Sequence, residues 1–170
     1  PGTGKSWSML QLHYLLATDL AGTTSPHHSG VRLVPLLVVV QQLVQMLVAK
    51  LQSSKSKGSA SSSNDLDNNM LVDYINWRYS DKPAEHDMLL QAYDMRTLIV
   101  LLDGIDEAAG FKERIGDFLV NELVPMGMRT IATSRPEGVR LQLYQKSFVI
   151  MNLEKLSDEQ QRSMILAQLN

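Results

Sequence analysis

Two runs of consecutive apolar residues stand out along the chain, and each is long enough for one buried strand. Residues 31–40 read Val-Arg-Leu-Val-Pro-Leu-Leu-Val-Val-Val, and residues 97–102 read Thr-Leu-Ile-Val-Leu-Leu. Continuous runs of this kind are typical of parallel strands that are covered on both faces. Pro35 lacks a backbone N–H, so the first half of its run is expected at an edge or a bulge. Shorter apolar runs predict two further strands, at residues 128–133 and 148–153.

Between these runs, apolar residues recur at the three- and four-residue spacing of helices. The pattern predicts helices over residues 4–21, 41–52, 66–79, 84–95 and 111–123. The first helix has such a broad apolar set that we expect it to be buried against a sheet. Residues 157–160, Ser-Asp-Glu-Gln, have the spacing of a capping box, so a last helix is expected to begin there.

The order of these elements predicts the fold class. Strands that alternate with helices indicate an α/β domain in which a largely parallel sheet is flanked by helices. A length of 170 residues suits one such domain. Residues 53–64 are rich in serine and have little to bury, so we expect a flexible surface loop there.

Composition and charge exclude several kinds of chemistry. The chain has no cysteine, which rules out a disulfide framework, a thiolate zinc site and a cysteine nucleophile. The formal net charge of −2 argues against a nucleic-acid partner held by neutralisation of its phosphates. The apolar runs fall short of the roughly 20 residues that a membrane span needs, so we expect no membrane span.

The first six residues, Pro-Gly-Thr-Gly-Lys-Ser, match the end of the phosphate-binding loop pattern G-x-x-x-x-G-K-[ST]. Glycines let the backbone wrap around a polyphosphate, the lysine supplies a cation for the β- and γ-phosphates, and the serine hydroxyl is an oxygen ligand for Mg²⁺. The helix that begins here adds the positive end of its dipole. An ordinary turn that caps a helix is the alternative. The candidate nucleotide-binding residues are Gly2, Thr3, Gly4, Lys5, Ser6 and Trp7.

Trp7 directly follows this motif. Its residue type favours packing in the core, and the alternative is that the indole packs against the loop or approaches the nucleotide.

The second apolar run leads directly into three acids, in the sequence Asp-Gly-Ile-Asp-Glu at 103–107. A carboxylate at the tip of a strand can hold a magnesium-bound water, which makes Asp103 a candidate metal ligand together with Ser6. Either Asp106 or Glu107 can orient and polarise the water that attacks a γ-phosphate. The alternative is that these two acids only begin a surface loop or cap the next helix, but a phosphate-binding loop upstream favours the nucleotide interpretation.

The predicted strand at 128–133 leads into Thr133, Ser134 and Arg135. The carboxyl ends of parallel strands lie at one edge of a sheet, so these three side chains are expected to face the same phosphate as Lys5 and Asp103. Arg135 can sense the γ-phosphate or stabilise charge in the transition state. A surface salt bridge is an equally good interpretation of this arginine taken alone.

Three segments in this order resemble the NACHT domain of the STAND class of P-loop NTPases: Pro-Gly-Thr-Gly-Lys-Ser, Leu-Leu-Asp-Gly-Ile-Asp-Glu and Thr-Ser-Arg-Pro-Glu-Gly-Val. The resemblance covers residues 1–153, and residues 154–170 resemble the start of the helical region that follows this core. It implies an ASCE-type sheet, of which the strand before the loop and the first glycine of the motif are cut off.

The resemblance also implies a function and a set of roles. Lys5 and Ser6 would be the Walker A residues, Asp103 the Walker B residue and Arg135 the sensor arginine, with Asp106 and Glu107 beside the hydrolytic water. ATP or GTP would bind with Mg²⁺ and be hydrolysed slowly, as a conformational switch in a cytoplasmic protein that assembles with itself or other modules through flanking domains. The alternative is a scaffold or interaction module that depends on the nucleotide without hydrolysing it.

Overall fold

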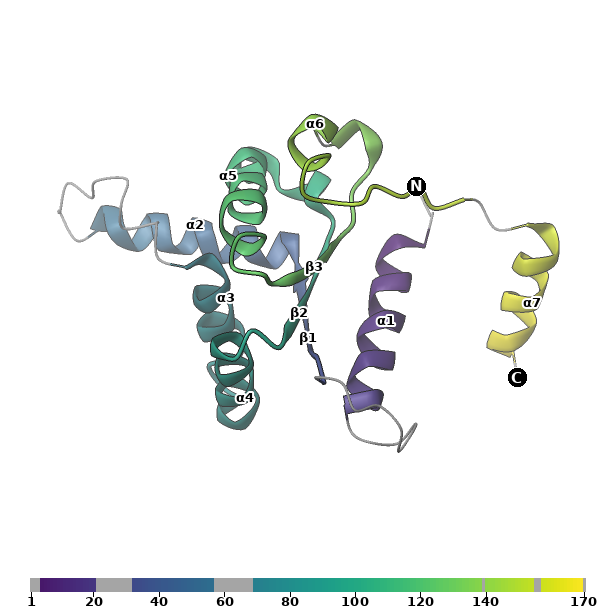
Figure 1. Cartoon of the computed structure of the whole chain (residues 1–170), viewed down its shortest axis with the longest axis horizontal. Helices are drawn as coiled ribbons and strands as arrows, with labels where there is room; N and C mark the ends of the chain where they lie inside the picture. Colours follow the sequence, from purple (N-terminus) through teal and green to yellow (C-terminus); the bar gives the residue numbers. More distant parts are fainter. Residues whose placement is uncertain (1–3, 21–31, 57–68, 139, 155–156, 170) are drawn as a thin grey trace.

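In the described part of the chain, the sheet has three parallel strands in the order β1-β2-β3, and helices cover both of its faces (Figure 1). The computed structural model describes residues 4–20, 32–56, 69–138, 140–154 and 157–169. The α/β architecture with a parallel sheet that the sequence predicts is therefore confirmed.

Three of the four predicted strands are present. They are β1 (Val34–Val39), β2 (Leu98–Asp103) and β3 (Arg129–Ala132). Pro35 lies in β1, which is an edge strand, as its missing N–H requires. β2 lies in the middle and is buried along its whole length except at Asp103, which is half-buried. The central strand therefore ends in a carboxylate at the carboxyl edge of the sheet.

The fourth predicted strand, at residues 148–153, is absent, and this prediction was wrong. The segment forms no strand, and Val149 and Met151 are 88% and 84% exposed. A run of apolar and β-branched residues becomes a strand only where a neighbour accepts its backbone hydrogen bonds. Within the described residues, the sheet ends at β3 and offers this segment no such neighbour.

The predicted helices are confirmed, with small differences in their ends. They are α1 (Lys5–Leu20), α2 (Val40–Ser56), α3 (Met70–Arg78), α4 (Pro83–Asp94) and α7 (Asp158–Leu169). The capping box of α7 forms as expected, because the Ser157 N–H donates to Gln160 Oε1 at 2.9 Å and the Gln160 N–H donates to Ser157 Oγ at 3.2 Å.

Two helical regions differ from the prediction. α2 continues to Ser56, so the first residues of the predicted serine-rich loop are helical, and the rest of that loop lies outside the described residues. The single helix expected at 111–123 is α5 (Lys112–Phe118) followed by a π-helical turn, η4 (Leu119–Leu123). A short helix that the sequence analysis did not predict, α6 (Leu141–Tyr144), lies beyond β3.

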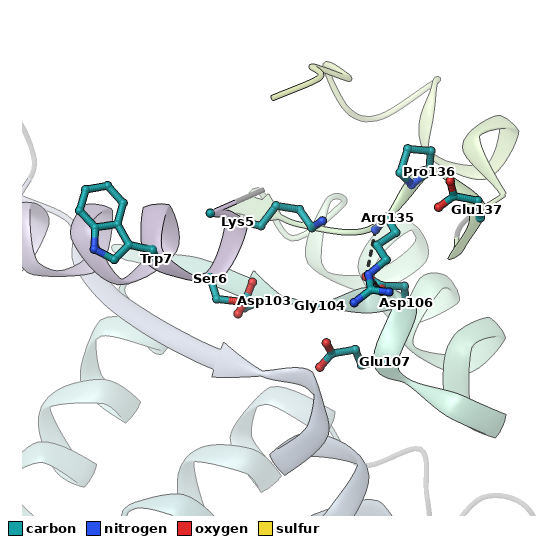
Figure 2. Close-up of a pocket in the computed structure, with 11 residues that line it drawn as sticks. Lys5, Ser6, Trp7, Asp103, Gly104, Asp106, Glu107, Arg135, Pro136 and Glu137 are labelled. Atoms are coloured by element: carbon teal, nitrogen blue, oxygen red, sulfur yellow. Dashed lines mark hydrogen bonds and ion pairs between the residues drawn. The ribbon is translucent and has the colours of Figure 1, made fainter. Parts of the chain in front are cut away.

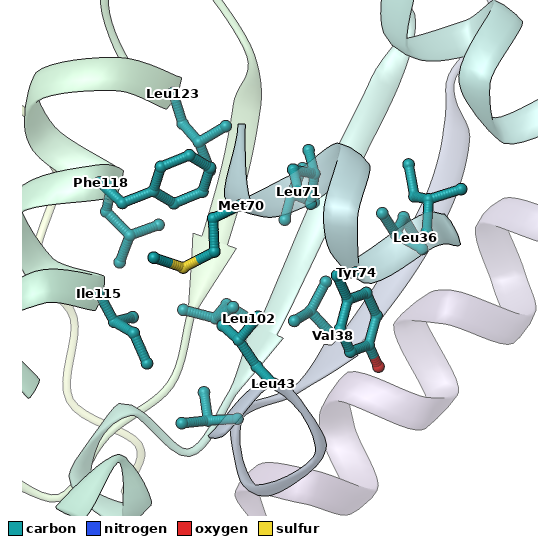
Figure 3. Packing of buried hydrophobic residues seen from close by; sticks show 14 of the residues in the cluster. Leu36, Val38, Leu43, Met70, Leu71, Tyr74, Leu102, Ile115, Phe118 and Leu123 are labelled. Carbon is teal, nitrogen blue, oxygen red and sulfur yellow. The ribbon is translucent and has the colours of Figure 1, made fainter. Parts of the chain in front are cut away.

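The core has two parts because side chains alternate along the central strand. Leu98, Val100 and Leu102 of β2 belong to the larger cluster, which α2 to α5 cover and which Figure 3 shows from close by. Ile99 and Leu101 point the other way and pack with Met9 of α1. Both faces of β2 are therefore buried, as a continuous apolar run requires.

α1 packs against the sheet as expected, but only the side that faces the sheet is covered. Met9 is 3% exposed, but Leu10, Tyr14 and Leu15 are 53%, 63% and 60% exposed. A helix that lies on one sheet covers only the stripe that faces it. Trp7 is 50% exposed as well, so the interpretation that it packs in the core is wrong.

The described helices do not include one with the length and apolar character needed to cross a lipid bilayer.

Candidate functional site

A cavity of about 390 Å³ lies at the carboxyl edge of the sheet (Figure 2). The start of α1 forms one side, and the turns that follow β2 and β3 form the other. These turns are η2 (Ile105–Glu107) and the segment that leads into η5 (Pro136–Gly138). The lining consists of Gly4, Lys5, Ser6, Trp7, Asp103, Gly104, Asp106, Glu107, Arg135, Pro136 and Glu137.

Most of the residues singled out in the sequence meet at this one cavity. Three segments that are far apart in the chain contribute: residues 4–7, residues 103–107 and residues 135–137. Gly2 and Thr3 lie outside the described residues. Sequence reasoning missed Pro136 and Glu137 as lining residues, although they directly follow Arg135 in the third motif and share its turn.

The loop side of the cavity is shaped by Gly4. Its φ of +72° lies in the left-handed region, and a Cβ at this position would meet nothing within 4 Å. Its carbonyl accepts the first helical hydrogen bond of α1, from the N–H of Ser8 at 2.8 Å. Lys5 and Ser6 therefore belong to the first turn of α1, where backbone N–H groups without helical partners favour an anion.

Trp7 also lines the cavity, on the side that the start of α1 forms. Figure 2 shows its indole pointing away from the side chains of Lys5 and Arg135. The ring is half exposed beside the cavity and belongs to neither core cluster.

Asp103 is held by Thr133, the residue that directly follows the neighbouring strand β3. Thr133 Oγ1 donates to Asp103 Oδ1 at 2.6 Å, and the N–H of Gly104 donates to Thr133 Oγ1 at 3.0 Å. The hydroxyl of Thr133 is therefore part of a hydrogen-bond chain inside the sheet edge. Thr133 is predicted to face the phosphate, but it is not among the residues that line the cavity, and its hydroxyl donates to Asp103.

Gly104 makes the turn that places the two later acids. Its φ is +84°, and a Cβ here would come within 3.3 Å of Cδ and Oε2 of Glu107. Ile105, which is 4% exposed, anchors the turn in the core. The side chain of Glu107 thus folds back against Gly104, with its carboxylate at the cavity.

The carboxylate of Asp106 contacts two residues that follow β3, Ser134 and Arg135. Its side chain is 11% exposed, and its carboxylate accepts from the Arg135 N–H at 2.9 Å and pairs with Arg135 Nε at 3.2 Å. The hydroxyl of Ser134 lies 3.4 Å from the same carboxylate. Ser134 is predicted to face the phosphate, but it is not among the residues that line the cavity.

The sequence leaves simpler alternatives open for two of these residues: a surface salt bridge for Arg135, and the start of a surface loop for Asp106. The salt bridge considered for Arg135 exists, and its partner is an acid of the second motif. Asp106 does more than begin a surface loop, since it ties the turn after β2 to the turn after β3.

The oxygen donors of the cavity fit Mg²⁺ that arrives with a phosphate ligand. Asp103 offers a carboxylate and Ser6 a hydroxyl, and both line the cavity. Mg²⁺ is commonly held by one or two carboxylates and completes its shell with waters and substrate phosphates. Across the described ranges, no group of three or more His, Cys, Asp or Glu is arranged to hold a metal ion.

Comparisons with protein-family models, with curated proteins and with solved structures give no match to this chain. The class that the fold and the cavity define is an α/β domain with a three-stranded parallel sheet flanked by helices, whose polar cavity lies at the carboxyl edge of the strands. This edge is the usual place for ligands in parallel α/β sheets.

Proposed function

We propose that this chain binds a nucleoside triphosphate, ATP or GTP, together with Mg²⁺, and hydrolyses it slowly as a conformational switch of the NACHT type. One observation carries the proposal. Lys5, Asp103 and Arg135 come from three separate segments, and all three line one cavity. The parallel sheet flanked by helices is compatible with a P-loop-like fold. The proposed setting is a cytoplasmic protein that assembles through other modules.

In this proposal, the phosphates bind at the start of α1. Lys5 and the first N–H groups of α1 bind the β- and γ-phosphates, because a cation and a helix N-terminus both attract a polyanion. Gly4 leaves open space where a side chain would otherwise stand. Ser6 and Asp103 supply the oxygens for Mg²⁺, which when bound neutralises phosphate charge and polarises the γ-phosphoryl group.

Glu107 is the better candidate of the two acids for orienting the attacking water. Asp106 already accepts from the backbone N–H of Arg135 and pairs with its side chain. Its carboxylate is therefore already engaged with Arg135 and is less available to orient a water. Glu107 is exposed and lines the cavity.

Arg135 supplies the second cation. Its side chain is 57% exposed although it pairs with Asp106. Because much of the guanidinium is exposed, a γ-phosphate in the cavity can reach it and replace Asp106 as its partner. In this role Arg135 distinguishes a triphosphate from a diphosphate.

The Asp106–Arg135 pair also favours the second candidate, a scaffold that holds the nucleotide without turnover. While the guanidinium stays with Asp106, it does not stabilise charge in a transition state. A single-turnover measurement separates the two functions, because the scaffold retains bound ATP for hours whereas the NTPase forms ADP within minutes.

The nucleotide proposal is tested by substituting the lysine. Lys5→Ala removes a charged partner of the phosphates, so we expect a fluorescent triphosphate to bind about 10- to 100-fold more weakly. The matched control is Lys82→Ala, which removes an exposed lysine that pairs with Glu85 at 3.4 Å and does not line the cavity. Equal affinities of Lys5→Ala and the unsubstituted protein in this titration refute the assignment.

A further inference from the structure

The carboxylate of Asp103 has one oxygen engaged inside the protein. Thr133 Oγ1 donates to Oδ1 at 2.6 Å, a short hydrogen bond between a hydroxyl and a carboxylate. This contact restricts rotation of the carboxylate about its bond to Cβ. The other carboxylate oxygen of Asp103, Oδ2, is not bonded to Thr133.

The direction of this hydrogen bond is fixed by the backbone. A threonine hydroxyl has one proton to donate, and its oxygen can accept in return. The N–H of Gly104 donates to that oxygen at 3.0 Å, so the hydroxyl proton points to Asp103. The turn after β2 therefore sets the orientation of its own strand-tip carboxylate through a side chain of the turn after β3.

The hydroxyl is not needed to join the two strand tips. The backbone of Thr133 already does so, because its N–H donates to the Leu102 carbonyl at 2.9 Å and its carbonyl accepts from the Ile105 N–H at 2.9 Å. Removal of the hydroxyl alone leaves these bonds in place. Its effect on Asp103 can thus be separated from the pairing of the strand tips.

We infer that Thr133 is a positioning residue for the metal site, because its hydroxyl orients the Asp103 carboxylate so that Oδ2 faces the cation. This inference rests on the proposed function, since it assumes that the cavity holds Mg²⁺ with a triphosphate. Thr133 itself does not touch the ligand. Groups that orient a metal ligand in this way typically change metal affinity about 10- to 100-fold when they are removed.

The test measures metal binding directly. Mn²⁺ replaces Mg²⁺, and its free concentration is followed by electron paramagnetic resonance in the presence of a non-hydrolysable triphosphate. Thr133→Val keeps the shape of the side chain and removes the hydroxyl, so Mn²⁺ should bind about 10- to 100-fold more weakly. Thr133→Ser keeps the hydroxyl and should stay within about threefold of the unsubstituted protein.

A matched control comes from β3, the strand that precedes Thr133. Thr130 Oγ1 donates to the Met128 carbonyl at 3.2 Å, and this side chain does not line the cavity. Thr130→Val should therefore leave Mn²⁺ affinity unchanged. Triphosphate affinity in EDTA reports on the Lys5 side of the cavity and should be the same in all variants. Should Thr133→Val fail to fold, Thr133→Ala tests the same hydroxyl.

The outcomes separate this inference from the proposal beneath it. If Mn²⁺ does not strengthen triphosphate binding in the unsubstituted protein, the proposed function fails and this inference with it. If Mn²⁺ does so and the folded Thr133→Val variant binds it equally well, the role of Thr133 alone is overturned. A loss in Thr133→Val that Thr133→Ser restores supports it.

Discussion

The carboxylate of Asp106 contacts Arg135 at two points: Oδ1 accepts from the Arg135 backbone N–H at 2.9 Å, and Oδ2 lies 3.2 Å from Arg135 Nε. Asp106 follows the central strand, and Arg135 follows its neighbour β3. The Asp106 carboxylate therefore fixes the path of the chain beyond β3. It also pairs with the Arg135 guanidinium, which is the cation proposed to bind the γ-phosphate. These two roles can be separated by substitution.

Asp106→Asn should loosen the side-chain pair and keep an acceptor for the Arg135 N–H. We expect little change in the free energy of unfolding, because the arginine is 57% exposed and such pairs contribute at most about 1 kcal/mol. We expect triphosphate to bind more tightly relative to diphosphate, because the guanidinium no longer has to leave a carboxylate. Urea unfolding and paired ATP and ADP titrations measure these two effects.

Asp106→Ala also removes the acceptor of the Arg135 backbone N–H, and should lower the free energy of unfolding by about 1 to 3 kcal/mol. Asp94→Asn, at an exposed position that does not line the cavity, controls for the loss of one negative charge. An unchanged ratio of ATP to ADP affinity in Asp106→Asn contradicts the proposed exchange of partners.

The part of the fold that could be predicted from the sequence is the part that local patterns determine. The run that ends at Asp103 is apolar on both faces, and such a strand lies in the middle of a parallel sheet. Its carboxyl end and that of β3 must then share one edge. This is why residues as distant as Lys5, Asp103 and Arg135 could be expected at one cavity.

The remainder depends on partners that a local pattern does not identify. Residues 148–153 have the composition of a strand, but strand formation requires a neighbour. Thr133 and Ser134 are expected to face a ligand, whereas in the folded chain the Thr133 hydroxyl donates to Asp103, and the Ser134 hydroxyl lies within reach of the Asp106 carboxylate and the Arg135 carbonyl. Trp7 shows the same limit, because residue type favours burial but the position on α1 decides it.

Gly104→Ala should disturb the turn that carries Glu107. A non-glycine residue at a φ of +84° costs about 1 to 2 kcal/mol, and the added Cβ also lies 3.3 Å from the Glu107 carboxylate. We expect hydrolysis to slow more than triphosphate binding weakens, because Glu107 is displaced while Lys5 is not. Single-turnover kinetics and a binding titration distinguish these effects.

Two other glycines serve as matched controls for this substitution. Gly127 has a φ of +74° with nothing within 4 Å of a Cβ, so Gly127→Ala measures the backbone cost alone. Gly110 has neither feature, and Gly110→Ala should be close to neutral. If Gly104→Ala slows hydrolysis no more than Gly127→Ala does, the contact with Glu107 has no catalytic role.

Gly116→Ala should displace two side chains that pack on α5 without a large loss of stability. A Cβ at Gly116 would lie 2.9 Å from the Tyr144 hydroxyl and 3.0 Å from Leu143 Cδ2, which are the ends of flexible side chains and can move at little cost. Alanine also favours a helix by about 1 kcal/mol over glycine. We therefore expect the free energy of unfolding in urea to change by less than about 1 kcal/mol. A loss of the size that overpacking of a rigid core causes, about 1 to 3 kcal/mol, contradicts this expectation.

Tyr74 should make the protein sensitive to alkali. Its ring lies in the larger core cluster (Figure 3), and burial raises the pKa of its phenol to about 12 from an ordinary value of 10.0. The folded state therefore keeps a proton that the unfolded state releases. This contribution to stability is complete below pH 10 and is lost as the pH rises towards 12, with a slope of at most about 1.4 kcal/mol per pH unit.

Tyr74→Phe removes this titration and should flatten the fall in the free energy of unfolding between pH 10 and 12. At neutral pH the variant should be less stable by about 1 kcal/mol, because the Tyr74 hydroxyl donates to Gln42 Oε1 at 3.0 Å. Burial also raises the pKa of Tyr79 and of Tyr144, so some alkaline loss should persist. Tyr14→Phe, at a position 63% exposed, is the matched control, and urea unfolding across this pH range is the measurement. Parallel curves for Tyr74→Phe and the unsubstituted protein are incompatible with a buried phenol at this position.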